Sequence, residues 1–194
     1  MEKFFIERIN IFGNNVTRES VIRNQIEIDE GDPFNQILYA KSLNNIKALN
    51  FFEEVNAKIL DGNQFNTKII DIEITEKPTG EIFAGVGTGT DGSNFSFGVK
   101  ENNYLGRGVK LDANLKVSEE RLKGKFLVSN PNYNNSDKNL DLSLEATSVD
   151  RLVTSGYKSD VTGFSIGTQF EYLDDLRFGL STRNTIEKID VDAT

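Results

Sequence analysis

Apolar and polar side chains alternate along most of residues 81–186, in segments of about ten residues. In the clearest segment the apolar positions are Val109, Leu111, Ala113, Leu115 and Val117. A period of two is typical of a β-strand, because successive side chains leave opposite faces of the pleated chain. The pattern predicts seven strands, at about residues 81–90, 93–102, 108–117, 122–129, 138–147, 159–171 and 175–186.

The predicted strands are longer than the five or six residues usual in soluble sheets. Ten residues tilted by about 45° span roughly 23 Å, which is close to the apolar band of a membrane β-barrel. Charged residues in mid-strand, such as Lys110, Asp141 and Glu145, favour a wall with one face in water. Alternation alone does not say which face is inside, so a soluble β-sandwich remains the alternative to a membrane barrel wall.

Residues 1–78 have a different pattern, which predicts a small α/β domain in the order β-α-α-β-β. Ile9 and Ile11 belong to the first strand, which ends at Gly13. The helices are expected from Thr17 to the break at Gly31-Asp32-Pro33, and at about residues 35–50. The last two strands are expected near residues 55–60 and 70–75, and the domain boundary near Pro78, which gives domains of residues 1–78 and 79–194.

Thr17 is the expected N-cap of the first helix, because its hydroxyl can accept a hydrogen bond from a free backbone N–H group. Val16 and Val21 occupy the positions of a hydrophobic staple around this cap.

The composition removes several classes of chemistry. The chain of 194 residues has no cysteine and no histidine, so it lacks thiol chemistry and the commonest general base and metal ligand. Its net charge of −8 argues against a nucleic-acid partner. We expect no catalytic residue, no cofactor and no metal site, and therefore no enzymatic activity.

Three motifs resemble active-site signatures but lack the required context. Ser165 lies in a G-x-S-x-G sequence, which needs a strand-to-helix turn and a histidine partner. Residues 87–92 match G-x-G-x-x-G, yet a strand follows them where a helix is required. The acidic pairs at 119–120 and 174–175 fall in predicted turns, so we interpret them as solvated turn charge.

Residues 3–77 resemble a polypeptide-transport-associated (POTRA) domain. The similarity rests on the β-α-α-β-β order, on Phe12-Gly13-Asn14 at the first strand end, and on residues 49–55 leading into the second strand. The POTRA family commonly has glycine where Asn50 stands, and asparagine also tolerates a left-handed helix end.

Residues 79–194 are similar to the opening strands of the barrel in the BamA family of outer-membrane protein assembly factors. The matching stretches are residues 79–90, the turn at 101–108 that fits N-x-[LF]-G-x-G, and Asn130-Pro131-Asn132-Tyr133, where Asn132 is inserted into an N-P-Y turn. The resemblance implies the last POTRA repeat and about half of a barrel of about sixteen strands. The family's Arg-Gly-[Phe/Tyr] loop motif is absent.

The resemblance implies a non-enzymatic assembly factor of the bacterial outer membrane, with its POTRA domain in the periplasm. The implied partners are unfolded outer-membrane proteins, outer-membrane lipids, assembly-complex lipoproteins and further POTRA repeats, with no nucleic acid. A related protein-secretion or translocation transporter and a soluble α/β plus β-sandwich binding module are the alternatives.

The resemblance also implies two sites that act through backbone groups. Client strands would pair with an exposed edge of the POTRA sheet and with the first barrel strand, which forms a weak lateral seam with the last strand. The expected edge residues are Val55, Asn56, Ala57, Lys58, Ile59 and Leu60. The expected seam residues are Ile82, Phe83, Ala84, Gly85, Val86, Gly87 and Thr88.

Overall fold

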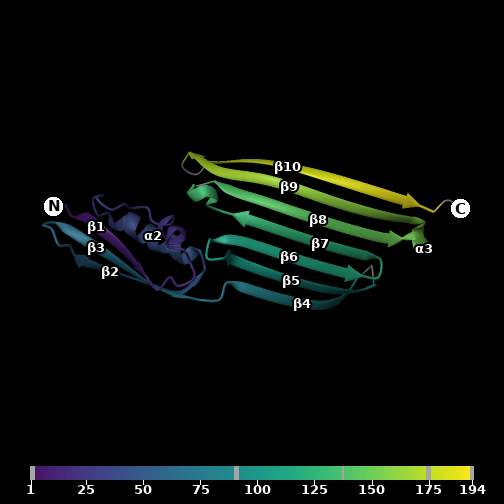
Figure 1. Cartoon of the computed structure of the whole chain (residues 1–194), viewed down its shortest axis with the longest axis horizontal. Coiled ribbons are helices and arrows are strands. Elements are labelled where there is room, and N and C mark those ends of the chain that lie inside the picture. The colour runs from purple at the N-terminus through teal and green to yellow at the C-terminus, as the bar shows by residue number, and fades with distance from the viewer. Residues whose placement is uncertain (1–2, 90–91, 137, 174–175, 193–194) are drawn as a thin grey trace. The chain divides into compact units, whose positions relative to one another are not determined.

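The chain folds into two units in a computed structural model that describes residues 3–89, 92–136, 138–173 and 176–192 (Figure 1). The first unit comprises Met1–Thr79 with Leu105–Gly108, and the second comprises Gly80–Tyr104 with Val109–Thr194. Asp91, between the first two predicted strands of residues 79–194, and the acidic pair Asp174-Asp175 lie outside the described residues.

The first unit has the predicted β-α-α-β-β order (Figure 1). Its elements are β1 (Phe5–Phe12), α1 (Glu19–Arg23), α2 (Gln36–Ala48), β2 (Phe52–Asp61) and β3 (Thr67–Glu76). The sheet order is β1-β3-β2, with β1 parallel and β2 antiparallel to the central strand β3. We call this three-stranded unit the α/β unit.

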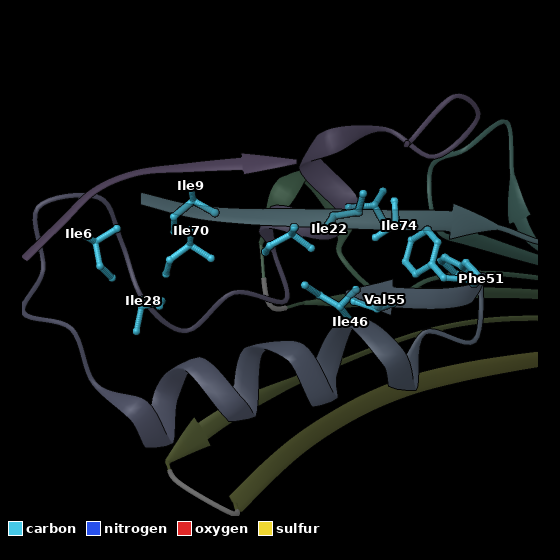
Figure 2. Close-up of a cluster of buried hydrophobic side chains, with 12 residues drawn as sticks. Ile6, Ile9, Ile22, Ile28, Ile46, Phe51, Val55, Ile70 and Ile74 are labelled. Atoms are coloured by element: carbon cyan, nitrogen blue, oxygen red, sulfur yellow. The ribbon is translucent and has the colours of Figure 1, made fainter. Parts of the chain in front are cut away.

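The core of the α/β unit lies between the sheet and the helices. Ile6, Ile22, Ile46 and Ile70 are its largest fully buried side chains, and Figure 2 shows them converging from both layers. Ile6 and Ile9 are both buried although they are three residues apart, because the register of β1 shifts between Ile6 and Arg8. The bulge therefore restores the inward direction of both isoleucines.

The first helix differs from the prediction. The α1 helix has only five residues, its N-cap is Arg18 without a side-chain cap bond, and Val16 is 67% exposed, so the predicted Thr17 cap and hydrophobic staple are wrong. A carboxylate from β3 holds the segment that precedes the helix: Glu76 accepts hydrogen bonds from the backbone N–H groups of Asn15, Val16 and Thr17 at 2.9, 2.8 and 2.6 Å. A long-range contact of this kind leaves no local sequence pattern.

The second helix ends as its sequence indicates. The side chain of Asn35 caps α2 by accepting hydrogen bonds from the N–H groups of Ile37 and Leu38. Asn50 follows the helix with φ of 59°, the left-handed conformation that glycine and asparagine adopt at helix ends. Among the described residues, no helix is both long and apolar enough to cross a membrane.

The second unit is a single antiparallel sheet of seven strands. The strands are β4 (Gly80–Gly89), β5 (Gly92–Tyr104), β6 (Val109–Ser118), β7 (Arg121–Asn130), β8 (Asn139–Arg151), β9 (Tyr157–Leu173) and β10 (Leu176–Val191). They follow one another in the sheet in chain order, from β4 at one edge to β10 at the other (Figure 1). Two short helical segments, η1 (Tyr133–Asn135) and α3 (Leu152–Ser155), lie in its connections.

The seven predicted strands are all present, and β8, β9 and β10 are longer than predicted. Charged residues continue their pairing: Lys158 faces Asp190, and Asp160 faces Lys188. The alternation of apolar and polar residues ends before these positions, so the sequence pattern did not extend to the strand ends.

The sheet presents its apolar residues on one uncovered face. Cross-strand neighbours on that face include Phe97, Leu115, Phe126 and Leu144, which are 52%, 44%, 41% and 52% exposed. In a β-sandwich these side chains would pack against a second sheet, and the described part of the chain contains none on this face. The sandwich alternative is therefore wrong, and the sheet is an open, partial barrel wall.

Replacing Ile46 with alanine tests the core of the α/β unit. Ile46 is fully buried, so Ile46→Ala should lower the free energy of unfolding by about 2–5 kcal/mol. Loss of the helical circular-dichroism signal in urea measures this free energy of unfolding, because α2 of the same unit is the longest helix among the described residues. Ile37→Ala, in the same helix at a 77% exposed position, is the matched control and should change it by about 0.5 kcal/mol or less. Equal effects of the two variants would contradict this core.

Candidate functional site

The two edges of the α/β sheet differ in how much of their backbone is hydrogen-bonded. Residues 30–34 run along β1 as an additional partner. The N–H group of Ile6 donates to the carbonyl of Asp32 at 2.9 Å, and the carbonyl of Ile6 accepts from Gly31 at 2.7 Å. Phe34 N–H donates to the Phe4 carbonyl at 2.8 Å. The beginning of β1 is thus closed to a further strand.

Side chains close the middle of the β1 edge. The N–H group of Ile9 donates to the carboxylate of Glu30 at 3.0 Å, and the guanidinium of Arg23 donates to the Ile9 carbonyl at 3.0 Å. Arg23 and Glu30 also form an ion pair at 3.8 Å. These two side chains therefore protect the backbone of a strand that would otherwise pair with other chains.

The opposite edge of the sheet, β2, contains the predicted edge residues Val55–Leu60. The strand pairs only with β3, and within the described ranges no loop or helix backbone bonds to residues 53–60. Lys58 forms an ion pair with Glu73 of the neighbouring strand at 3.1 Å, which keeps its ammonium group over the sheet. The backbone edge of β2 is the open edge of this sheet.

A carboxylate holds the turn at the end of β2. Glu7 accepts hydrogen bonds from the Thr67 hydroxyl at 2.7 Å, from the Asn63 side chain at 2.8 Å and from the Asn63 N–H group at 2.7 Å. These bonds, that from Thr67 foremost, lower the pKa of Glu7 from 4.5 to about 2. The strand β1 thereby fixes the end of the open edge strand through the β2–β3 turn.

The second predicted site, Ile82–Thr88, lies in β4, which forms one edge of the seven-stranded sheet. The strand pairs only with β5, in a continuous register from Gly80 with Glu101 to Gly89 with Gly92. Over the described residues no strand lies on its other side, so the backbone groups that point away from β5 are available for pairing.

The two faces of β4 are unequal. Ile82, Ala84 and Val86 continue the apolar face, where Ile82 and Val86 are 75% and 76% exposed. Gly85 and Gly87 lie on the polar face and contribute no side chain there. The strand therefore packs few side chains against its neighbour, and its register is held mainly by the backbone ladder.

Phe83 departs from the apolar alternation, because it lies on the polar face over Gly98 of β5. The two residues are direct register partners, and a Cβ atom at Gly98 would come within 2.0 Å of the Phe83 ring. Gly98 therefore leaves room for the ring, as in pairs in which an aromatic side chain covers a cross-strand glycine. The sequence analysis missed this pair, and the signal was an aromatic residue out of phase in β4.

The contacts of the active-site-like motifs are structural. Glu120, predicted to be solvated turn charge, instead forms an ion pair with Arg151 at 2.9 Å. Ser165 lies within β9, and its hydroxyl is 2.6 Å from that of Ser143 in β8, which is a cross-strand contact. The G-x-G-x-x-G stretch includes residues 90–91, which lie outside the described residues, and its second half leads into strand β5. No group of three or more acidic residues suited to a metal ion occurs within the described ranges.

Comparison with known proteins relates both units to outer-membrane proteins. The POTRA family, described as "Surface antigen variable number repeat", matches residues 4–77. The outer membrane protein assembly factor BamA of Buchnera aphidicola is 30% identical over 144 residues, which are 71% of this chain and 23% of that protein.

Two kinds of solved structure share the fold. BamA from Haemophilus ducreyi lacking POTRA domains 1–3 aligns with 96% of this chain and 36% of its own, at 22% identity and a TM-score of 0.81. CdiB from Escherichia coli aligns with 97% of this chain and 38% of its own, at 14% identity and a TM-score of 0.67. The chain thus spans about a quarter of its curated relative and just over a third of these structures.

We call the hydrogen bonds that Glu7 accepts from Asn63 and Thr67 the Glu7 clamp. Removing this clamp should destabilise the α/β unit in a pH-dependent way. The pKa of Glu7 is lower in the folded state than its ordinary value of 4.5, so its stabilisation is fully present above pH 4.5 and is lost as the pH falls toward 2. We expect Glu7→Gln to lower the urea midpoint at pH 7 and to flatten its decline between pH 4.5 and 2.

The matched control for this prediction is Glu53→Gln, which removes a carboxylate of β2 outside the clamp. It should leave the pH dependence of the urea midpoint unchanged. A Glu7→Gln protein that keeps the wild-type pH dependence would show that the clamp contributes nothing to stability.

Proposed function

Because the chain belongs to the BamA family, we propose that it acts in assembling β-barrel proteins into the bacterial outer membrane, by pairing client strands with the open edges of β2 and β4. The single observation that carries this proposal is the edge of β4, which has no neighbouring strand among the described residues and belongs to a sheet with one apolar, uncovered face. Such an edge offers main-chain donors and acceptors at membrane depth.

The driving force lies in the backbone of the client. An unpaired N–H or C=O group in hydrocarbon costs several kcal/mol, so a client strand gains strongly by pairing with any available edge. The β4 edge gives main-chain bonds without demanding particular side chains, because Gly85 and Gly87 leave its polar face bare. Clients of different sequence can therefore use the same strand.

The glycines also make the strand easy to release. A strand with few packed side chains holds its register weakly, so a later strand of the client can replace the pairing. Client folding would then supply the energy for insertion, and the proposal requires neither a nucleotide nor a catalytic residue.

The β2 edge fits an earlier step in water. With β1 covered from Phe4 to Ile9 by residues 30–34 and by Arg23 and Glu30, β2 is the edge of this sheet with the longer uncovered row of backbone groups for an extended client segment. We place this unit in the periplasm, where further POTRA repeats and assembly-complex lipoproteins would be its neighbours. A strand added to β2 keeps the client extended until it reaches lipid.

A secretion transporter is the second candidate, and the likeness to CdiB favours it. The CdiB fold matches the whole span of this chain, with a lower TM-score than BamA. Both candidates use the same architecture and differ in whether the client strand stays in the membrane. Recovery of a crosslinked client in the membrane fraction supports assembly, and its release outside the cell supports secretion.

Disulfide crosslinking to a client tests the β4 edge, because the chain has no cysteine of its own. We expect Ala84→Cys to crosslink to an unfolded barrel client that carries one cysteine in a terminal strand. A strand paired with β4 lies about 4.8 Å away, within the Cα separation that a disulfide requires. The yield on non-reducing gels is the measurement.

Ala146→Cys is the matched control, because Ala146 lies on the same apolar face in β8, which is paired on both sides. Its yield should stay at background. In the α/β unit, Asn56→Cys on β2 should crosslink more than Glu73→Cys, its register partner on the central strand. Equal yields at edge and interior positions would overturn the pairing mechanism.

A further inference from the structure

A hollow with positively charged walls lies on the polar face of the sheet, at the end where β4 turns into β5. Its volume is about 330 Å³, and it is lined by Gly89, Gly92, Asn94, Lys116, Ser118, Arg121 and Lys123. All of these residues share the polar face, because they occupy matching positions in the registers of β4 to β7. We call it the cationic hollow.

Two lysines face each other directly in the wall of the hollow. Lys116 of β6 and Lys123 of β7 are cross-strand register partners, and both are exposed. Like charges directly opposite in an antiparallel pair destabilise the sheet, so this arrangement costs free energy in the absence of an anion.

The structure provides no carboxylate for these two lysines, in contrast to the next lysine along β7. Lys125 forms an ion pair with Glu145 of β8 at 3.8 Å. Over the residues that the structure describes, neither Lys116 nor Lys123 forms an ion pair or a side-chain hydrogen bond. The carboxylate of Glu119 lies beside Gly92 at the rim. Two positive charges in the wall thus lack a counter-charge.

The remaining lining adds the guanidinium side chain of Arg121 and neutral polar residues. Asn94 and Ser118 are register partners next to the lysines. The side-chain amide of Asn94 can donate a hydrogen bond to an oxygen atom, whereas the Ser118 hydroxyl donates to the Arg121 carbonyl at 3.3 Å. Gly87 and Gly89 add no side chain, so the floor beside Asn94 stays open. The hollow therefore combines two ammonium groups, a guanidinium group, one neutral amide donor and free space.

From this arrangement we propose that the cationic hollow binds a phosphate-bearing anion, with Lys116 and Lys123 as its charged ligands and Asn94 as a neutral donor. A phosphate group carries enough negative charge and enough acceptor oxygens to lie between two ammonium groups. Binding would convert the repulsion between the lysines into attraction to a shared ligand. A lipid headgroup and a soluble phosphate present the same chemistry.

The first test is calorimetric titration of the full chain in neutral detergent micelles with inorganic pyrophosphate. We expect saturable binding, weakened about tenfold or more in the double variant Lys116→Gln/Lys123→Gln, because hydrogen bonds to charged groups are lost. The matched control is Lys110→Gln/Lys125→Gln, which removes the same charge from the same face of β6 and β7. Its affinity should stay within about twofold of the wild type.

The two double variants distinguish specific binding in the hollow from general electrostatic attraction. Absence of binding to the wild type, or equal weakening in both double variants, would overturn the proposal, because only general electrostatic attraction would remain. Strand circular dichroism of each variant establishes that it is folded.

A bilayer comparison then identifies the source of the phosphate. The chain is reconstituted in phosphatidylcholine bilayers with and without phosphatidic acid, and pyrophosphate affinity is measured again. Weaker wild-type binding with phosphatidic acid, but not in the Lys116→Gln/Lys123→Gln variant, assigns the hollow to a lipid headgroup. Unchanged wild-type binding assigns it to a soluble phosphate.

Discussion

Pairing of backbone hydrogen-bonding groups is the constraint on which the rest of this molecule depends. In hydrocarbon each N–H and C=O group needs a partner, and a sheet provides partners for every strand except the two at its edges. Strands β5 to β9 satisfy this requirement on both sides, whereas β4 and β10 satisfy it on one. Within the described residues, the outer edge of β4 is therefore where we propose that a further strand pairs with this wall.

The α/β unit also has sheet edges with backbone groups to satisfy, and it covers one edge and leaves the other exposed. Its β1 edge is closed by the backbone of residues 30–34 and by the Arg23–Glu30 pair, while its β2 edge has no such cover among the described residues. Protecting one edge and leaving the other open directs strand addition to a single place. Carboxylates then fix the loops around the sheet: Glu7 holds the β2–β3 turn, and Glu76 holds the segment before α1. Burial opposes ionisation of Glu76, but its hydrogen bonds from Thr17, Val16 and Asn15 prevail and lower its pKa.

The sequence predicted what depends on local periodicity and missed what depends on distant contacts. Alternation located all seven strands of the wall, and the order β-α-α-β-β was correct, as was the left-handed Asn50. The cap at Thr17 was wrong because Thr17 lies before the helix, in a segment whose N–H groups are bound by Glu76, about sixty positions away. The closure of β1 by residues 30–34 left no local pattern, and the Phe83–Gly98 pair left only an aromatic residue out of phase in β4, because each depends on which segments lie side by side. Both predicted edge segments lie on edge strands, and their role in binding clients stays a prediction.

The central claim is that the apolar face of the seven-stranded sheet contacts lipid and that its polar face contacts water. Spin labels on single cysteines from residue 111 to 116 in β6, in the chain reconstituted in bilayers, test it most directly. We predict that collisions with oxygen, which partitions into lipid, are frequent at odd positions, and that collisions with a water-soluble nickel complex are frequent at even positions. Low accessibility to both reagents at the odd positions would mean that protein covers the apolar face, and would contradict the membrane wall.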